Sequence, residues 1–339
     1  MFPKEKNEAV MRALRTTFGA AGIEDLRLLS GGGRADLIFR IVVQGSPFLL
    51  RIIRRTDDPV CHFTCMQAAA DAGLAPQVLY TSVEDRICIT GFVNAVPLSP
   101  QDALVRLPAA LRTLHALPPF PARAAHLNTT CTFLLNEGPA RDEFIQGFQA
   151  SGVLPSTGKE RLLDLYANIV AAYSGHNADM VSSHNDLLKP DNILFDGERV
   201  WLVDWEAAFL NNRYVDLAAV ANFVLTGDDD ERIYLQQYFG QPPTPYQQAC
   251  FFLIRQLTHI FYAMAFLLLG SAGNPVRWTE DLPDFKDFHR RLWTGELNIR
   301  DSHVKVDYGK VHWQRLMENV RHPRFAEALK VVSATRAHS

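Results

Sequence analysis

Short apolar runs separated by polar turns mark residues 181–223, VSSHNDLLKPDNILFDGERVWLVDWEAAFLNNRYVDLAAVANF. Two of these runs, 193–195 and 200–203, flank the pair Asp196-Gly197. Short β-prone runs on either side of Asp-Gly predict a β-hairpin, because these two residues accept the backbone angles of a tight turn. We therefore expect the residues before the first strand to lie close to the residue after the second.

The ends of the predicted hairpin carry oxygen-bearing side chains. Asp186 and Asn192 precede the first strand, and Asp204 follows the second. Two carboxylates and an amide oxygen are hard ligands that suit Mg²⁺, an ion that also holds substrate phosphates. A single Asp in such a turn is more often a cap that binds backbone N–H groups, but the order of the three residues favours phosphoryl-transfer chemistry.

The first hundred residues show alternating apolar positions and glycine turns, which predict a small sheet. The run Gly31-Gly32-Gly33 follows the first strand, and such a turn can approach phosphates because no Cβ intervenes. Taken alone it is more often a tight hairpin, and GGGRAD does not match the GxGxxG motif. The expected strands are 26–30, 37–43, 48–53, 78–81 and 86–90, with helices at 5–18 and 61–72.

Beyond residue 98 the apolar residues recur at helical spacing. The most hydrophobic stretch, 251–269, carries Arg255, Gln256 and His259, and its longest uninterrupted apolar run is shorter than the ~18 residues of a membrane span. We therefore expect a core helix there and no membrane span. The helices predicted in this part of the chain are 101–117, 139–150, 157–173, 214–225, 229–238, 246–269, 285–297 and 324–334.

Composition and charge narrow the possible functions. The 339 residues suffice for two domains with cores of their own. Lys and Arg number 34 against 37 Asp and Glu, so the net charge of −3 provides no general attraction to nucleic acid, and any phosphate binding must be local. Five scattered cysteines predict reduced thiols, and the N-terminus has no apolar signal region, so we expect a cytoplasmic protein.

Four motifs occur in order within about forty residues, and together they are specific. They resemble the catalytic and metal loops of kinase-like small-molecule phosphotransferases, most closely the choline/ethanolamine kinases and their aminoglycoside phosphotransferase relatives. The resemblance covers about 20–225 well and the C-terminal third poorly. The motifs are HNDL at 184–187, NIL at 192–194, LVDWE at 202–206 and NRYVDLA at 212–218.

The resemblance implies a role for each matching residue. Asp186 would be the base that accepts the proton of the substrate hydroxyl, Asn192 and Asp204 would hold Mg²⁺, and Asp216 would support the catalytic loop from the next helix. One interval differs from the family pattern, because Asn192 follows Asp186 by six residues where five are usual. We infer a one-residue bulge near 187–188, which leaves open whether Lys189 or Glu206 faces the phosphates.

The resemblance also implies a nucleotide site. Gly31, Gly32 and Gly33 stand where the family has its nucleotide loop, and Arg51 stands where the third strand places a cation on the phosphates. Gly91, Phe92 and Val93 match the segment whose backbone binds adenine. Protein kinases pair the strand cation with a helix Glu, but this chain has no acidic residue between Asp58 and Asp71. The ion pair is therefore absent or is supplied by another residue.

The fold implied by the resemblance is α+β and protein-kinase-like, with two lobes. A small antiparallel-sheet lobe with an opening helix would occupy 1–94, and a larger, mainly helical catalytic and substrate-binding lobe would occupy 95–339. The expected cofactors are ATP and Mg²⁺, and the expected activity is that of a kinase with an alcohol group as phosphate acceptor.

The acceptor is less closely defined. The LVDWE and NRYVDLA motifs favour a choline-like or ethanolamine-like molecule, and an aminoglycoside, a sugar or another small alcohol is the alternative. Four aromatic residues could form a cage for a quaternary ammonium, although aromatic residues on helices more often pack in the core. A nucleotide-binding pseudokinase that acts as a scaffold is an alternative of another class. The cage candidates are Tyr262, Trp278, Phe285 and Trp293.

Overall fold

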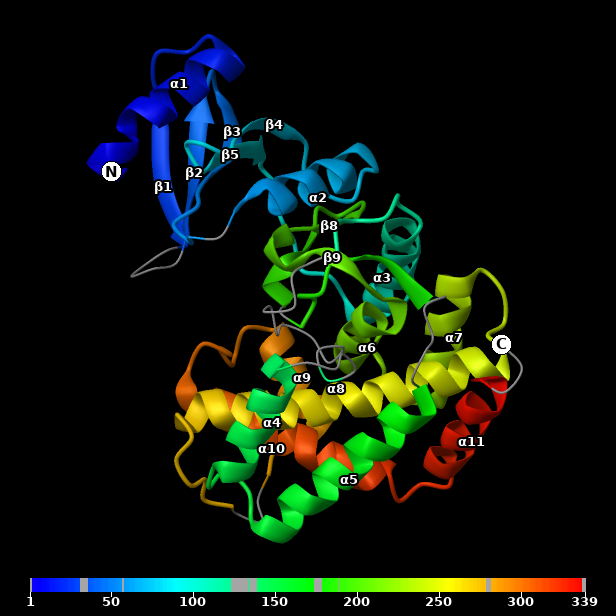
Figure 1. Ribbon diagram of the computed structural model, residues 1–339. Helices are drawn as coiled ribbons and strands as arrows, with labels where there is room; N and C mark the ends of the chain where they lie inside the picture. Colours follow the sequence, from blue (N-terminus) through cyan, green and yellow to red (C-terminus); the bar gives the residue numbers. More distant parts are fainter. Residues whose placement is uncertain are drawn as a thin grey trace. The chain divides into compact units, whose positions relative to one another are not determined.

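The computed structural model of the protein (Figure 1) describes residues 2–30, 36–56, 58–122, 134, 139–173, 179–188, 190–278 and 282–336. The chain forms two compact units, and each is described by itself. The first comprises Met1–Leu98 and Asp191–Phe209, and the second comprises Ser99–Pro190 and Leu210–Ser339. The predicted domains, 1–94 and 95–339, stay a prediction, and the compact units differ from them by grouping 191–209 with the N-terminal part.

The first unit contains a five-stranded antiparallel sheet with strand order β1-β2-β3-β5-β4. All five strands coincide closely with those predicted. The unit also contains a short opening 3₁₀ helix and two α-helices, of which α2 lies between β3 and β4. The bounds are η1 Lys4–Lys6, α1 Asn7–Phe18, β1 Asp25–Ser30, β2 Leu37–Val43, β3 Ser46–Ile52, α2 Val60–Asp71, β4 Val78–Ser82 and β5 Ile87–Gly91.

Helix α1 packs on the sheet because both present apolar residues at the right period (Figure 1). In β2 the alternate residues Phe39, Ile41 and Val43 are buried, as expected for a strand with one face in a core. Val10 and Leu14, one helical turn apart in α1, are fully buried in the same core cluster. Burial of this apolar face, rather than helix propensity, provides most of the stability of so short a helix.

The predicted hairpin is present in the first unit. Strands β7 (Ile193–Phe195) and β8 (Val200–Leu202) pair in antiparallel register, and Gly197 in the turn has φ +98°, a conformation that favours glycine. Backbone hydrogen bonds attach the hairpin to the rest of the unit: Leu202 donates to Leu74 at 2.7 Å, and Val96 donates to Phe195 at 2.7 Å. These bonds explain why 191–209 belongs with the N-terminal part.

The second unit is mainly helical, with two short paired strands. The sequence predicted most of its helices, including α8, whose N-terminus is a capping box between Thr244 and Gln247. The 3₁₀ helix η5 (Trp205–Ala207) and part of η4 (Pro190–Asn192) and of β9 (Phe209–Asn212) lie in the first unit. The other bounds are α3 Pro100–His115, α4 Pro139–Ala150, α5 Ser156–Tyr173, β6 Met180–Ser183, α6 Arg213–Val224, α7 Asp228–Phe239, α8 Pro245–Ser271, α9 Phe285–Trp293, α10 Ser302–Asn319 and α11 Arg324–Arg336.

Helix α10 was missed by the sequence analysis. Its buried face mixes apolar residues such as Val304, Val311 and Leu316 with Lys310 and His312, so polar residues interrupt the apolar stripe. It packs along α8, and Figure 1 shows the two helices side by side. A Cβ on Gly309 would lie 2.9 Å from the backbone N of Leu267, so glycine is what allows this close approach.

Helix α8 is the one helix in the described ranges that is long and apolar enough to cross a membrane. However, 72% of its most apolar window is buried within the protein. Burial of this kind is typical of the central helix of a soluble protein, and the prediction of a core helix agrees with it.

Candidate active site

The hairpin places two predicted site residues at its open end. Asn192 directly precedes β7, Asp204 follows β8 by one residue, and the intervening Val203 donates its N–H to the carbonyl of Asn192 at 3.0 Å. Asn192 is buried. The expectation that the hairpin brings these two residues to one end is therefore confirmed, and their amide and carboxylate oxygens are a donor set that fits Mg²⁺.

Asp204 has an unusual backbone conformation. Its φ of 71° and ψ of 59° lie in the left-handed region, which residues with a Cβ rarely adopt. Such a conformation costs on the order of 1 kcal/mol and persists only where the surroundings hold it. Strain of this kind clusters at functional sites, and at Asp204 it coincides with a predicted metal ligand.

Arg51, the last residue but one of β3, is bound by carboxylates at both ends of its guanidinium. Its Nε donates to Asp36 Oδ2 at 3.1 Å, and one terminal nitrogen, Nη2, donates to Asp204 Oδ1 at 2.7 Å. The same Nη2 lies 3.5 Å from Glu206 Oε2. Burial opposes the charge of Arg51, but the carboxylates of Asp204 and Asp36 raise its pKa above the ordinary value, so the guanidinium is charged.

Asp36 supplies a carboxylate that pairs with Arg51, the role that a helix Glu has in protein kinases. Asp36 was not among the residues predicted for the site, although a signal was present: it directly precedes β2, the strand that pairs with β3, and Ile38 is opposite Arg51. Of the two possibilities left open, absence of the ion pair and supply by another residue, the structure shows the second. The carboxylate that pairs with Arg51 Nε thus comes from the residue directly before β2.

The second unit holds the loop that carries Asp186. Asp216, fully buried in α6, accepts the backbone N–H of His184 through Oδ2 and that of Asn185 through Oδ1, each at 2.8 Å. His115 Nε2 lies 3.3 Å from Asp216 Oδ2, and His115 Nδ1 lies 2.7 Å from the hydroxyl of Tyr238. Asp216 therefore supports the loop, as the resemblance implied.

Asp216 is ionised despite its burial. Burial acts to raise its pKa, but the hydrogen bond and charge of His115, with the contacts from His184, lower the pKa below its ordinary value. A buried carboxylate that accepts several N–H groups commonly behaves in this way. The charge gives each hydrogen bond to the loop more strength than a neutral acceptor would.

The backbone immediately before Asp186 is turned by Asn185, which has φ +67°. Asn accepts this region more readily than most residues, and its side chain is held by Asn211, whose Nδ2 donates to Asn185 Oδ1 at 2.6 Å. Asp186 itself is buried, with 8% of its surface exposed. Its approach to Asn192 and Asp204, which belong to the first unit, stays a prediction.

The six-residue interval after Asp186 is irregular where a bulge was predicted. Leu187 and Leu188 form a turn, Leu187 is buried, and Pro190–Asn192 is a single 3₁₀ turn. Lys189 lies outside the described residues, so its contact with a phosphate stays a prediction.

The other predicted nucleotide residues have mixed outcomes. Gly31, Gly32 and Gly33 lie outside the described residues. Gly91 ends β5, and its backbone N–H already donates a hydrogen bond to the carbonyl of Gln77 at 2.8 Å. Phe92 and Val93 are half-buried and follow the end of β5, and the guanidinium of Arg40 lies 5.5 Å from the centre of the Phe92 ring. The adenine contact proposed for this segment stays a prediction.

The four cage candidates pack against other aromatic rings. Tyr262 and Phe285 each pack against His312, at ring-centre distances of 5.0 and 5.4 Å. Trp278 contacts Trp313, and Trp293 contacts Phe223. Only 5% of the surface of Tyr262 is exposed. These contacts are those of core packing, and they lend the cage no support.

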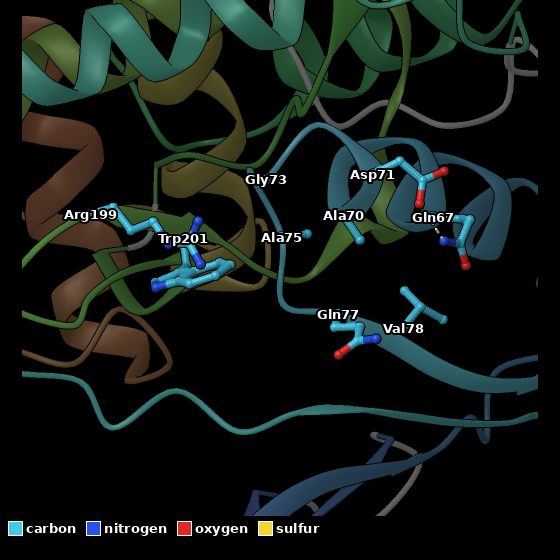
Figure 2. Close-up of a pocket in the computed structure, with 9 residues that line it drawn as sticks. All are labelled: Gln67, Ala70, Asp71, Gly73, Ala75, Gln77, Val78, Arg199 and Trp201. Carbon is cyan, nitrogen blue, oxygen red and sulfur yellow. Dashed lines mark hydrogen bonds between the residues drawn. The ribbon is translucent and has the colours of Figure 1, made fainter. Parts of the chain in front are cut away.

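A separate hollow of about 250 Å³ lies in the first unit. Figure 2 shows Arg199 stacked on Trp201 at one side and Asp71 bonded to Gln67 at the other. Its lining includes none of the predicted site residues. The nine residues are Gln67, Ala70, Asp71, Gly73, Ala75, Gln77, Val78, Arg199 and Trp201.

Comparison with protein families gives one match, to the phosphotransferase enzyme family, over residues 25–250. This range covers more than half of the chain and contains Arg51, Asp186, Asn192 and Asp204. The protein belongs to this phosphotransferase family. A comparison with curated protein sequences found no significant match.

Several solved structures with a similar fold are named as small-molecule kinases or phosphotransferases. A choline/ethanolamine kinase family protein from Mesorhizobium loti is 20% identical, with a TM-score of 0.66, over 97% of this chain and 99% of that one. A choline kinase from Streptococcus pneumoniae is 16% identical, with a TM-score of 0.54, over 94% and 99%. A spectinomycin phosphotransferase in complex with ADP and spectinomycin is 12% identical, with a TM-score of 0.54, over 90% and 98%.

The phosphotransferase thus has the kinase-like α+β fold expected from its motifs. Its N-terminal part is the small antiparallel sheet and its C-terminal part is mainly helical, as in these neighbours. The levels of identity show the fold alone, so substrate and cofactors must be argued from the site.

Proposed function

We propose that this phosphotransferase moves the γ-phosphate of Mg²⁺-bound ATP to a hydroxyl of a small molecule, with a choline-like or ethanolamine-like acceptor favoured. The observation that carries the proposal is the pairing of Arg51 with Asp204 at the end of the hairpin that also bears Asn192. A buried cation and two oxygen ligands in one place are what an ATP phosphate group and its metal require.

Each residue has a distinct part in the proposed reaction. Asp186 accepts the proton of the attacking hydroxyl, which makes the oxygen a better nucleophile. Asn192 and Asp204 hold the metal, and Arg51 orients the phosphates by charge-assisted hydrogen bonds. Bound Mg²⁺ supplies positive charge that neutralises the charge developing on the transferred phosphoryl group.

The choice of acceptor rests on the motifs and on the fold. LVDWE and NRYVDLA are nearer to choline/ethanolamine kinases, and a member of that family is among the similar structures. An aminoglycoside acceptor is the second candidate, favoured by the similar fold of a spectinomycin phosphotransferase. Of the two features that favoured a pseudokinase scaffold, the missing helix carboxylate is replaced by Asp36, and the six-residue interval after Asp186 still stands.

The test is release of ADP by the purified protein with Mg²⁺-ATP and a panel of acceptors: choline, ethanolamine, aminoglycosides and neutral sugars. The matched variant is Asp186→Asn, which keeps the size of the side chain and removes the proton acceptor. We expect kcat to fall about 10²-fold or more while ATP affinity is unchanged. Native turnover by Asp186→Asn would show that Asp186 is not the base, and ATP binding without turnover of any acceptor would favour the scaffold.

A further inference from the structure

Asp36 is a buried carboxylate with both oxygens engaged. Oδ2 accepts Arg51 Nε at 3.1 Å, and Oδ1 accepts the backbone N–H of Arg54 at 2.9 Å. Its side chain is 5% exposed. The second bond ties Asp36 to the residue that follows β3 by two positions, so the carboxylate is fixed to the same strand that carries Arg51.

The two ends of the Arg51 guanidinium meet different kinds of partner. Asp36 has no predicted chemical role and binds Nε, while Asp204 is a predicted metal ligand and binds Nη2. A guanidinium is planar and presents its donors in a fixed fork, so a bond at Nε determines where Nη2 points.

Helix α2 offers no substitute for Asp36. Its acidic residue is Asp71, at the last position, which accepts a hydrogen bond from Gln67 at 2.8 Å and lines the hollow in Figure 2. The sequence of α2, VCHFTCMQAAAD, contains no Glu and no other Asp. Arg51 is therefore anchored by Asp36, which directly precedes β2, and not by a residue of α2.

Three carboxylates and two guanidinium groups meet around Arg51 among the described residues. Asp36, Asp204 and Glu206 contribute three negative charges, and Arg51 and Arg55 contribute two positive ones, with Arg55 Nη1 3.3 Å from Glu206. Arg51 binds Asp204 Oδ1, and a metal held by Asp204 would compete for this oxygen. Arg51 must therefore be able to release Asp204 while its own position is kept.

We propose that Asp36 is a positioning residue that holds Arg51 through a hydrogen bond to Nε. When a metal binds Asp204, Arg51 Nη2 would then be free to leave Asp204 and to bind a phosphate oxygen of the nucleotide. The anchoring is a property of the protein alone. The exchange with phosphate rests on the proposed function.

The anchoring is tested without nucleotide by NMR of protein labelled with ¹⁵N-arginine, with the Arg51 signal assigned from Arg51→Lys. We expect the Arg51 Nε–H to exchange slowly with solvent and to exchange at least about tenfold faster in Asp36→Asn and Asp36→Ala, since a bond to a charged group is lost. Asp25→Asn is the matched control, because Asp25 pairs with Arg40 across β1 and β2 at 3.1 Å but is exposed. Equal exchange in Asp36→Asn and Asp25→Asn would overturn the anchoring.

The exchange with phosphate is tested by calorimetry of Mg²⁺-ATP binding in a double-mutant cycle. We expect Asp36→Asn to weaken binding about tenfold in the native background and less than about twofold in Arg51→Ala, because Asp36 acts through Arg51. A purely structural role would give the same loss in both backgrounds and would overturn the proposal, as would unchanged affinity of Asp36→Asn. If the native protein fails to bind Mg²⁺-ATP, the proposed function fails, and the NMR exchange still decides the anchoring.

Discussion

Asp216 Oδ1 accepts the backbone N–H of Asn185 at 2.8 Å, and Asn185 is the residue directly before Asp186. The other oxygen of Asp216 accepts the N–H of His184 at the same distance. A single buried carboxylate on α6 therefore fixes two consecutive peptide groups of the loop. Because peptide groups are rigid and planar, this also restricts the direction in which Asp186 leaves the backbone.

The first prediction concerns this bond. Asp216→Asn would present an NH₂ group to at least one backbone N–H, and we expect it to lower kcat about 10- to 100-fold, with ATP affinity changed less than about twofold, because the loop and not the nucleotide contacts are disturbed. Stability should fall by about 3 kcal/mol as a buried charged network is broken. Steady-state kinetics and urea unfolding measure the two effects. Asp228→Asn, at an exposed position in α7, should change neither, and an equal effect of both variants would contradict the prediction.

The second prediction separates Asp204 from its neighbour Glu206. In Asp204→Ala we expect Mg²⁺ no longer to strengthen ATP binding, because a carboxylate ligand is lost, while the fold persists since Arg51 keeps Asp36. Glu206→Gln, which alters a carboxylate 3.5 Å from the same guanidinium, should retain the Mg²⁺ effect. Calorimetry of ATP binding with and without Mg²⁺ provides the comparison. Unchanged Mg²⁺-ATP affinity in Asp204→Ala would show that Asp204 is structural.

The third prediction concerns the acceptor. If the substrate is a choline-like cation, kcat/KM should be higher for trimethylated than for unmethylated amino alcohols, because methyl groups spread the charge over apolar and aromatic surfaces. The measurement is kcat/KM for choline, its partly methylated analogues and ethanolamine at one ATP concentration. A higher kcat/KM for an aminoglycoside or a neutral sugar would refute the choline-like reading and leave the general phosphotransferase function.

Three buried histidines lie close together in the second unit. His259 Nδ1 and His312 Nδ1 are 2.8 Å apart, so one ring donates and the other accepts, and His289 Nδ1 donates to the carbonyl of Phe285 at 2.8 Å. The Nε2 atoms of all three are buried, with no hydrogen-bond partner among the described residues. Burial, followed by the charge of Arg255, lowers the pKa of His259 well below 6.5, and burial lowers that of His289 to about 4. All three rings are neutral at pH 7.

The fourth prediction follows from the sign of these shifts. Below the unfolded-state pKa, near 6.5, the unfolded chain binds protons that the folded protein excludes, so the free energy of unfolding falls as pH falls from about 6.5 towards 4. At pH 5 each such histidine costs up to about 2 kcal/mol relative to pH 7. In His289→Gln the difference between the two pH values should shrink by about that amount, and in His303→Gln, which is exposed in α10, it should not change. Urea unfolding at both pH values measures this, and a pH-independent unfolding free energy would contradict it.

Local features were readable from the sequence because they depend on neighbours in the chain. The Asp196-Gly197 turn with an apolar run on each side was sufficient to predict the β7–β8 hairpin, and with it the proximity of Asn192 and Asp204. The length and hydrophobicity of 246–269 predicted α8 in the same way. The motif order led to the phosphotransferase family.

Only the tertiary structure decided which side chains meet across the fold. Asp36 and Arg51 are separated by fifteen residues, and they pair because β2 and β3 are adjacent. Of the aromatic residues considered for a cage, Tyr262 and Phe285 pack on the same ring, that of His312, whereas Trp278 packs on Trp313. The sequence by itself determined the hairpin, the motif residues and the family, because short-range turn and periodicity rules govern them. The partner of Arg51 and the packing of α10 on α8 depend on long-range contacts, which no local pattern specifies.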